Sequence, residues 1–138
     1  MDLYQNAQET EQAAIALLNT GFYRQAIYFA CLATELYLKS KLHLVEHDID
    51  LEASHNTEKL YKALLVRFKP TDDLLPMATH FRKYFNESRY PYSFDASAYT
   101  ESFTKEFLDY LTAIKAYIDN DCIATIEDLA TKHSQSRH

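Results

Sequence analysis

One long apolar stretch constrains the fold of this chain more than any other feature. It runs from Phe22 to about Val45, and no charged residue stands between Arg24 and Glu35. The stretch is too long for one buried strand and contains neither Gly nor Pro, so it predicts a helix that neighbours cover on most sides. Several of its alanines recur at helical spacing, which would let a second helix approach closely. We therefore expect a central helix around which the other segments pack.

The scarcity of turn-forming residues extends this expectation to the whole chain of 138 residues. One Gly and three Pro are too few for the many turns of an all-β protein, whereas long helices with few connections need almost none. The sequence predicts an all-α fold, namely an up-and-down antiparallel bundle of about four to five main helices with a short C-terminal helix. We assign residues 1–132 to a single domain and expect a disordered tail at 133–138.

The bounds of the helices follow from local signals. Gly21, the only glycine, should end the first helix in the left-handed conformation. Asn56 should cap the third helix, and the acidic segment 46–52 has no sustained period and is interpreted as a connection. Besides the central helix, the pattern predicts helices from Leu3 to Asn19, from Asn56 to the stop at Lys69-Pro70, from about Asp73 to Ser88, and from a start between Ser97 and Ser102.

The cysteine usage and the lack of targeting signals bear on the compartment. Cys31 lies in the apolar stretch, where a thiolate would be costly, so we expect a core residue rather than a nucleophile. No stretch has the pattern of a signal peptide or a membrane span. We expect a cytoplasmic protein with reduced thiols and no membrane partner.

Metal binding is not expected. His43 and His47 are four residues apart and flanked by acids, but no HExxH pattern and no third ligand accompany them. We interpret them as polar residues at a helix end and expect neither a metal nor a cofactor.

The charge is unevenly distributed along the chain. A net charge of -6 argues against general affinity for nucleic acids. The middle of the chain is nevertheless basic, and two interpretations stand: ordinary solvated helix faces, or a cationic face that binds an anion. The bases concerned are Lys59, Lys62, Arg67, Lys69, Arg82, Lys83 and Arg89.

Four short motifs occur together and in a particular order. They are Gly21-Phe22-Tyr23 with Ala26, Ala33-Thr34-Glu35-Leu36-Tyr37-Leu38-Lys39, Ser54-His55-Asn56 with Leu60, and Ser88-Arg89-Tyr90-Pro91. From roughly Ala7 to Ile118 the chain resembles the HEPN domain, the helical partner of minimal nucleotidyltransferases in prokaryotes. The resemblance implies an up-and-down helical bundle that usually pairs into dimers.

The chain departs from the ribonuclease members of that family. Many of them carry an Arg followed four to six residues later by His, and no Arg of this chain has that His. Asp95, six residues after Arg89, would be a poor general acid at neutral pH. The family's usual Asp after Arg-Tyr-Pro is Tyr92 here. A glycine loop for phosphate and a nucleotidyltransferase Gly-Ser with paired acids are absent as well.

The departures favour a non-catalytic module. It would bind a nucleotide, RNA or the substrate of a separately encoded nucleotidyltransferase at a dimer cleft, through Arg89, Tyr90, His55, Arg82 and Asp95. Arg89 and Tyr90 have a second interpretation, in which they lock their loop onto the bundle. Two other functions stay open: a divergent ribonuclease toxin of the toxin–antitoxin type, which uses Arg89 with Asp95 or His55, and a purely structural dimer.

The aromatic content predicts a homodimer. Eleven Tyr and eight Phe exceed what the core of one small bundle needs. Tyr is favoured where the ring is buried and the hydroxyl group meets water, as at a subunit contact. A two-fold contact would bring both copies of Arg89 toward one cleft, where an anion would relieve their repulsion. We expect the contact to contain Tyr84, Phe85, Tyr110 and Tyr117 beside Tyr90, Tyr92 and Phe94.

Overall fold

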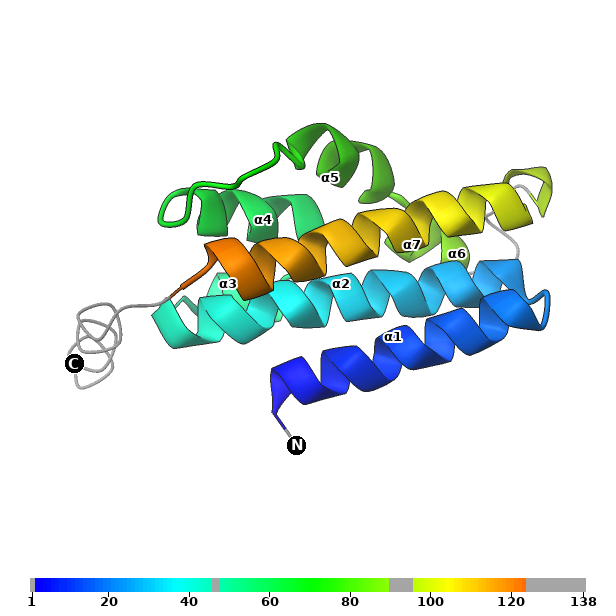
Figure 1. The fold of residues 1–138 in the computed structure, drawn as a ribbon, viewed down its shortest axis with the longest axis horizontal. Coiled ribbons are helices and arrows are strands. Elements are labelled where there is room, and N and C mark those ends of the chain that lie inside the picture. The colour runs from blue at the N-terminus through cyan, green and yellow to red at the C-terminus, as the bar shows by residue number, and fades with distance from the viewer. Residues whose placement is uncertain (1, 46–47, 90–95, 124–138) are drawn as a thin grey trace.

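The computed structural model describes residues 2–45, 48–89 and 96–123, and these form a bundle of helices (Figure 1). No strand occurs within those ranges. The all-α helical bundle predicted from the sequence is thus confirmed. The predicted tail and almost all of the predicted short C-terminal helix lie outside the described residues.

The first two helices form an antiparallel pair. α1 (Leu3–Asn19) and α2 (Tyr23–Val45) lie side by side and are joined by a short turn (Figure 1). Gly21 has a φ of 82°, its N–H donates to the carbonyl of Leu18, and the N–H of Phe22 donates to that of Leu17. This is the Schellman pattern of a helix C-terminus, which needs a left-handed residue at the glycine position. The predicted bounds and the predicted role of Gly21 are confirmed.

α2 is the central helix. α1, α4 (Thr57–Leu65), α6 (Tyr84–Arg89) and α7 (Glu101–Ala116) all pack against it. Its Ala26, Ala30 and Ala33 are fully buried. Cys31 is also buried, and the loss of solvent raises the pKa of its thiol well above the usual range, as expected for a core cysteine.

The connection between α2 and α4 contains a helix that the sequence pattern did not predict. Asp48 caps the start of α3 (Ile49–Ala53), and its carboxylate accepts hydrogen bonds from the backbone N–H groups of Asp50 and Leu51 at 2.9 and 3.3 Å. The expectation of an irregular connection is wrong from Ile49 onward, because a side-chain cap stabilises a helical turn that has no apolar period.

His43, at the end of α2, faces a single carboxylate of α3. Its Nδ1 lies 3.5 Å from Oε1 of Glu52, and no group of three metal-ligating side chains occurs among residues 2–45, 48–89 and 96–123. His47 lies outside the described residues.

The predicted helix from Asp73 to Ser88 is in fact two helices. α5 (Leu75–Phe81) contains Pro76 in its first turn, and α6 begins after a break at Arg82 and Lys83. The expectation of one helix is wrong because the two pieces pack on different neighbours: α5 contacts α4, whereas α6 contacts α2. One straight helix would not follow both.

The aromatic side chains fill the core between α5, α6 and α7. The ring of Phe81 lies 4.6 Å from that of Phe107 and 5.1 Å from that of Tyr110. The ring of Tyr84 lies 4.9 Å from that of Phe103. Most of this cluster is therefore internal to one chain.

This packing corrects the predicted subunit contact. Tyr84, Phe85, Tyr110 and Tyr117 are between 1% and 8% exposed within the monomer, so they are not the surface of a contact between two chains. The expectation is wrong for these four because other helices of the same chain supply enough partners to bury them. The loop aromatics Tyr90, Tyr92 and Phe94 lie outside the described residues.

The turn after the C-terminal end of α7 is joined by hydrogen bonds to the segment between α4 and α5. Thr100 caps the start of α7, and a π-helical turn, η3 (Tyr117–Asp121), follows its end. There the carboxylate of Asp121 accepts hydrogen bonds from the backbone N–H and the hydroxyl of Thr71. A short 3₁₀ turn, η2 (Ala96–Ala98), precedes α7.

Across the part of the chain that the structure describes, no helix has the length and apolarity to cross a membrane.

The glycine turn yields a prediction for stability. Gly21→Ala should destabilise the fold by about 1 kcal/mol, because an alanine is strained in the left-handed conformation although no atom lies within 4 Å of its Cβ. Urea unfolding measures the loss. Gln12→Ala, at an exposed position of α1, is the control and should change stability by less than about 0.5 kcal/mol. Equal stability of Gly21→Ala and wild type would contradict this account of the turn.

Candidate functional site

An open cleft of about 410 Å³ lies where the start of α4 faces α6. His55 and Asn56 come from the turn before α4, and Phe85 belongs to α6. The break between α5 and α6 contributes two adjacent cations, Arg82 and Lys83. The sequence pattern did not predict this break, and the break shapes the cleft. The complete lining among the described residues is His55, Asn56, Arg82, Lys83, Phe85 and Arg89.

The cleft is cationic. Three of its lining residues are permanently charged bases, and none of the described lining residues is acidic. Lys83 makes no ion pair within the described ranges, and its Nζ lies 5.1 Å from the centroid of the Tyr84 ring. Such an arrangement attracts an anion, because three cations line the cleft and none of its described lining residues is a carboxylate.

Arg82 is held from outside the cleft by a carboxylate of α4. Its Nη1 lies 3.5 Å from Oε1 of Glu58, and the same oxygen lies 3.8 Å from Nζ of Lys62. The hydroxyl of Thr79 donates to the other oxygen of Glu58. The Thr79 hydrogen bond, aided by the two cations, lowers the pKa of Glu58 against the opposing effect of burial. Glu58 therefore stays ionised and steadies Arg82 at the rim.

Phe85 organises the middle of the cleft. The imidazole of His55 stacks on its ring, with centroids 5.3 Å apart and planes 8° from parallel. The guanidinium carbon of Arg89 lies 5.6 Å from the centroid of the same ring. Phe85 is only 6% exposed, so one fixed ring places two polar side chains.

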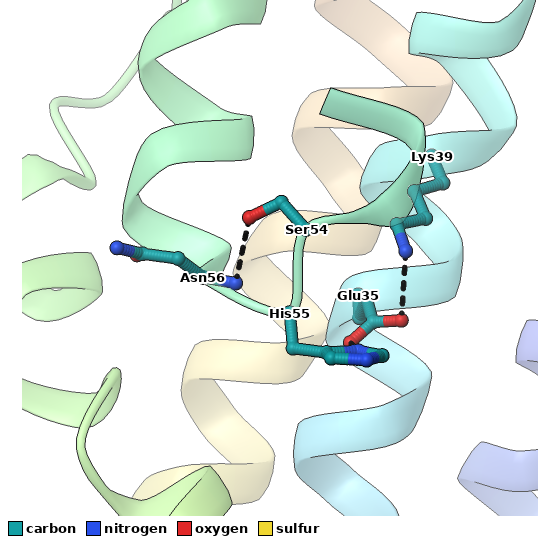
Figure 2. A network of polar contacts seen from close by, with 5 residues as sticks. All are labelled: Glu35, Lys39, Ser54, His55 and Asn56. Carbon is teal, nitrogen blue, oxygen red and sulfur yellow. Dashed lines mark hydrogen bonds and ion pairs between the residues drawn. The ribbon is translucent and has the colours of Figure 1, made fainter. Parts of the chain in front are cut away.

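His55 is also fixed by a buried carboxylate of α2 (Figure 2). Its Nδ1 lies 2.9 Å from Oε1 of Glu35, and Nζ of Lys39 lies 3.0 Å from Oε2 of the same residue. A carboxylate only accepts, so we assign the proton of the neutral imidazole to Nδ1 and leave Nε2 as an acceptor. Glu35 and Lys39 are four residues apart on α2, the spacing that favours an ion pair within a helix.

The neighbouring Asn56 is occupied with helix capping. Its Oδ1 accepts from the backbone N–H of Lys59 at 3.2 Å, and its own N–H donates to Oγ of Ser54 at 3.1 Å. In Figure 2 its side chain leaves the turn on the side away from His55. The capping role predicted for Asn56 is confirmed.

The end of α6 is tied to the central helix. Nη1 of Arg24 donates to the carbonyl of Ser88 at 2.6 Å, and the hydroxyl of Ser88 donates to the carbonyl of Tyr84 at 2.5 Å. These bonds fix the last turn of α6, the turn that contains Arg89. Arg24 thus acts on the cleft without lining it.

Three of the five residues predicted to bind a ligand meet at this cleft. His55, Arg82 and Arg89 line it together, whereas Tyr90 and Asp95 lie outside the described residues. Sequence reasoning did not assign Lys83, or Glu35 as the partner of His55, to the site. The basic stretch that contains Lys83 was a usable signal for it, but no local pattern connects Glu35 with a residue 20 positions away.

Comparisons with known proteins agree with the fold. The model of the HEPN domain family matches residues 1–120. The crystal structure of TT1696 from Thermus thermophilus is similar with a TM-score of 0.74 at 25% sequence identity, over 85% of this chain and 93% of that one. A search of curated proteins finds no match.

The network around Glu58 predicts a pH-dependent stability. Because the folded pKa of Glu58 is lowered, its contribution to stability is present above the ordinary carboxyl pKa of about 4.3 and is lost as the pH falls through the folded pKa. Glu58→Gln should therefore be less stable than wild type at pH 7, by up to about 1 kcal/mol, and the difference should shrink toward pH 3. Urea unfolding across this pH range measures it.

The control for this experiment is Glu9→Gln. Glu9 is exposed on α1 and forms no ion pair among the described residues, so its replacement should leave the pH profile of stability unchanged. A difference for Glu58→Gln that stays constant from pH 7 to pH 3 would contradict the assigned network.

Proposed function

The chain belongs to the HEPN domain family, and on that premise we propose that it is a non-catalytic binding module for a phosphate-bearing ligand. The ligand is a nucleotide or a segment of RNA, in keeping with the nucleotide- and RNA-related role of the family. One observation carries the proposal: Arg82, Lys83 and Arg89 converge on one cleft whose described lining contains no carboxylate. Guanidinium and ammonium groups are the side chains that bind phosphate most strongly in proteins.

The overall charge limits how such a ligand is bound. With a net charge of -6, the long-range field of the protein repels nucleic acid, so affinity must come from contacts inside the cleft. Three cations would neutralise about three phosphates at most. Each neutralised phosphate of a single strand releases counterions and contributes about −0.7 to the slope of log affinity against log salt concentration. The proposal implies a salt dependence no steeper than about −2 on a log–log scale.

A partner enzyme fits the same proposal. A separately encoded nucleotidyltransferase would use the module to hold the nucleotide or RNA on which the enzyme acts. The cleft is open rather than enclosed by the described chain, which leaves a second protein room to reach a bound ligand.

RNA cleavage is a second candidate function, and one observation favours it. His55 lies in the same cleft as Arg82 and Arg89, and Glu35 orients it so that Nε2 is available as a base. A carboxylate behind the imidazole ring is a usual support for a general base. In this second candidate function His55 would carry the proton transfer, although the chain lacks the Arg and His spacing of the ribonuclease members.

The cleft predicts which cations matter for binding. Lys83→Ala and Arg82→Ala should each weaken binding of a short fluorescein-labelled single-stranded RNA by about tenfold, because each removes a charge-assisted contact to phosphate. Fluorescence anisotropy at fixed salt measures the affinity. Lys105→Ala is the charge-matched control, since Lys105 lies on α7 and pairs with Glu101 at 3.0 Å; it should bind as wild type does.

Two outcomes would contradict this proposal. If Lys83→Ala and Lys105→Ala bind RNA equally well, the cleft is not the binding site. On a denaturing gel the incubated RNA should remain intact; cleavage that His55→Ala abolishes, in a variant of unchanged helical content, would establish the second candidate function instead.

We also propose a homodimer in which the two copies of Arg89 face one cleft. HEPN domains often dimerise, and Arg89 is exposed at the end of α6. Two guanidinium groups brought close repel each other unless an anion lies between them. The dimer and anion binding would then strengthen each other.

Light scattering tests this proposal directly. At micromolar concentration in chloride the average mass should exceed that of one chain, and inorganic phosphate at equal ionic strength should raise the average mass toward that of a dimer. A monomer in both buffers would refute the dimer without affecting the cleft of a single chain.

A further inference from the structure

We infer that the imidazole of His55, supported by Phe85, is a stacking platform for a nucleobase. The cleft would then select nucleotides over simple phosphate compounds. This inference rests on the proposed function, because the cations must hold the phosphate, but it adds a base subsite that the cations alone do not require.

The stack has one closed side and one open side. The rings of His55 and Phe85 are 8° from parallel, and Phe85 is 6% exposed, so it is fixed in the core. The side chain of His55, in contrast, is 60% exposed. A flat ring with a buried ring behind it and solvent before it offers a π-face on which a base continues the stack.

The platform is already ordered before a ligand arrives. Glu35, whose side chain is 9% exposed, holds Nδ1 of His55 at 2.9 Å and is itself held by Lys39 at 3.0 Å (Figure 2). The imidazole therefore loses little rotamer freedom on stacking. Loss of such freedom is the usual entropic cost when a ligand binds to a surface side chain. Glu35 acts here as a positioning residue.

The phosphate and the base can be held together. The guanidinium of Arg89 lies 5.6 Å from the Phe85 centroid, and Arg82 and Lys83 line the same cleft. The volume of about 410 Å³ falls in the range of small-ligand sites, roughly 300 to 1,000 Å³. A nucleoside monophosphate, or the terminal nucleotide of a single strand, combines the two groups that this cleft accepts.

The platform should tolerate different bases. The amide oxygen of Asn56 is occupied by the cap of α4, and its side chain leaves the turn away from His55 (Figure 2). Stacking itself discriminates weakly, since every base has a π-face. The inferred ligand class is therefore a nucleotide without strong base specificity.

Isothermal titration of the full chain with AMP, UMP and ribose 5-phosphate tests the inference. All three carry the same phosphate monoester, and only the first two carry a base. AMP should bind about 5- to 150-fold more tightly than ribose 5-phosphate, which corresponds to one base stack. AMP and UMP should differ by less than about tenfold.

Variants at His55 separate stacking from other roles. His55→Phe should keep the preference for AMP over ribose 5-phosphate, because it keeps a ring; His55→Ala should abolish the preference while ribose 5-phosphate binds about as before. In both variants Glu35 keeps its ion pair with Lys39, so its buried carboxylate still has a charged partner. His80→Ala is the matched control: His80 is exposed on α5 outside the cleft, and its loss should leave the preference intact.

Each remaining outcome has a definite meaning. Equal affinity of wild type for AMP and ribose 5-phosphate would overturn the platform and leave the proposed anion site standing. A preference that survives in His55→Ala would also overturn it. If neither AMP nor ribose 5-phosphate binds, the proposed function fails for small ligands and the inferred base subsite fails with it.

Discussion

The burial of α2 on nearly all sides is the constraint on which the rest of this structure depends. A helix with so little polar surface has to be covered, and α1, α4, α6 and α7 cover it. Where α2 is covered, its polar groups lose contact with water, and each of these groups must find a partner on its own helix or on a neighbouring segment. Thr34 bonds to its own helix, whereas Arg24 and Glu35 reach out of α2 to other segments.

Those two polar side chains of α2 define the two walls of the cleft. Glu35 holds His55 at the start of α4, and Arg24 holds the carbonyl of Ser88 at the end of α6. The requirement to satisfy buried polar groups in the core therefore also fixes the surface geometry. Phe85 connects both walls, since it packs beneath His55 and lies beside the guanidinium of Arg89. A cleft built this way is rigid because its supports lie in the interior.

The aromatic residues and the charges are divided between core and rim in a consistent manner. The rings of α5, α6 and α7 pack on one another inside the chain, which explains the high Tyr and Phe content without a second subunit. The bases at the break between α5 and α6 remain at the surface, where Glu58 steadies Arg82 from behind. A chain of net negative charge thus presents a local cationic site, and such a site favours a ligand that enters the cleft over one that spreads across the surface.

The sequence by itself determined the parts of this protein that depend on neighbours within about four residues. The bounds of α1 and α2, the left-handed Gly21, the Asn56 cap and the pair of Glu35 with Lys39 all follow from such local rules, and so they were predictable. His55, Arg82 and Arg89 were singled out as candidates, but their meeting in one cleft was not derivable from spacing. Only the tertiary structure decided the break between α5 and α6, the pairing of Glu35 with His55 and the burial of the aromatic face. Each of these depends on contacts between segments far apart in the chain, which no local pattern encodes.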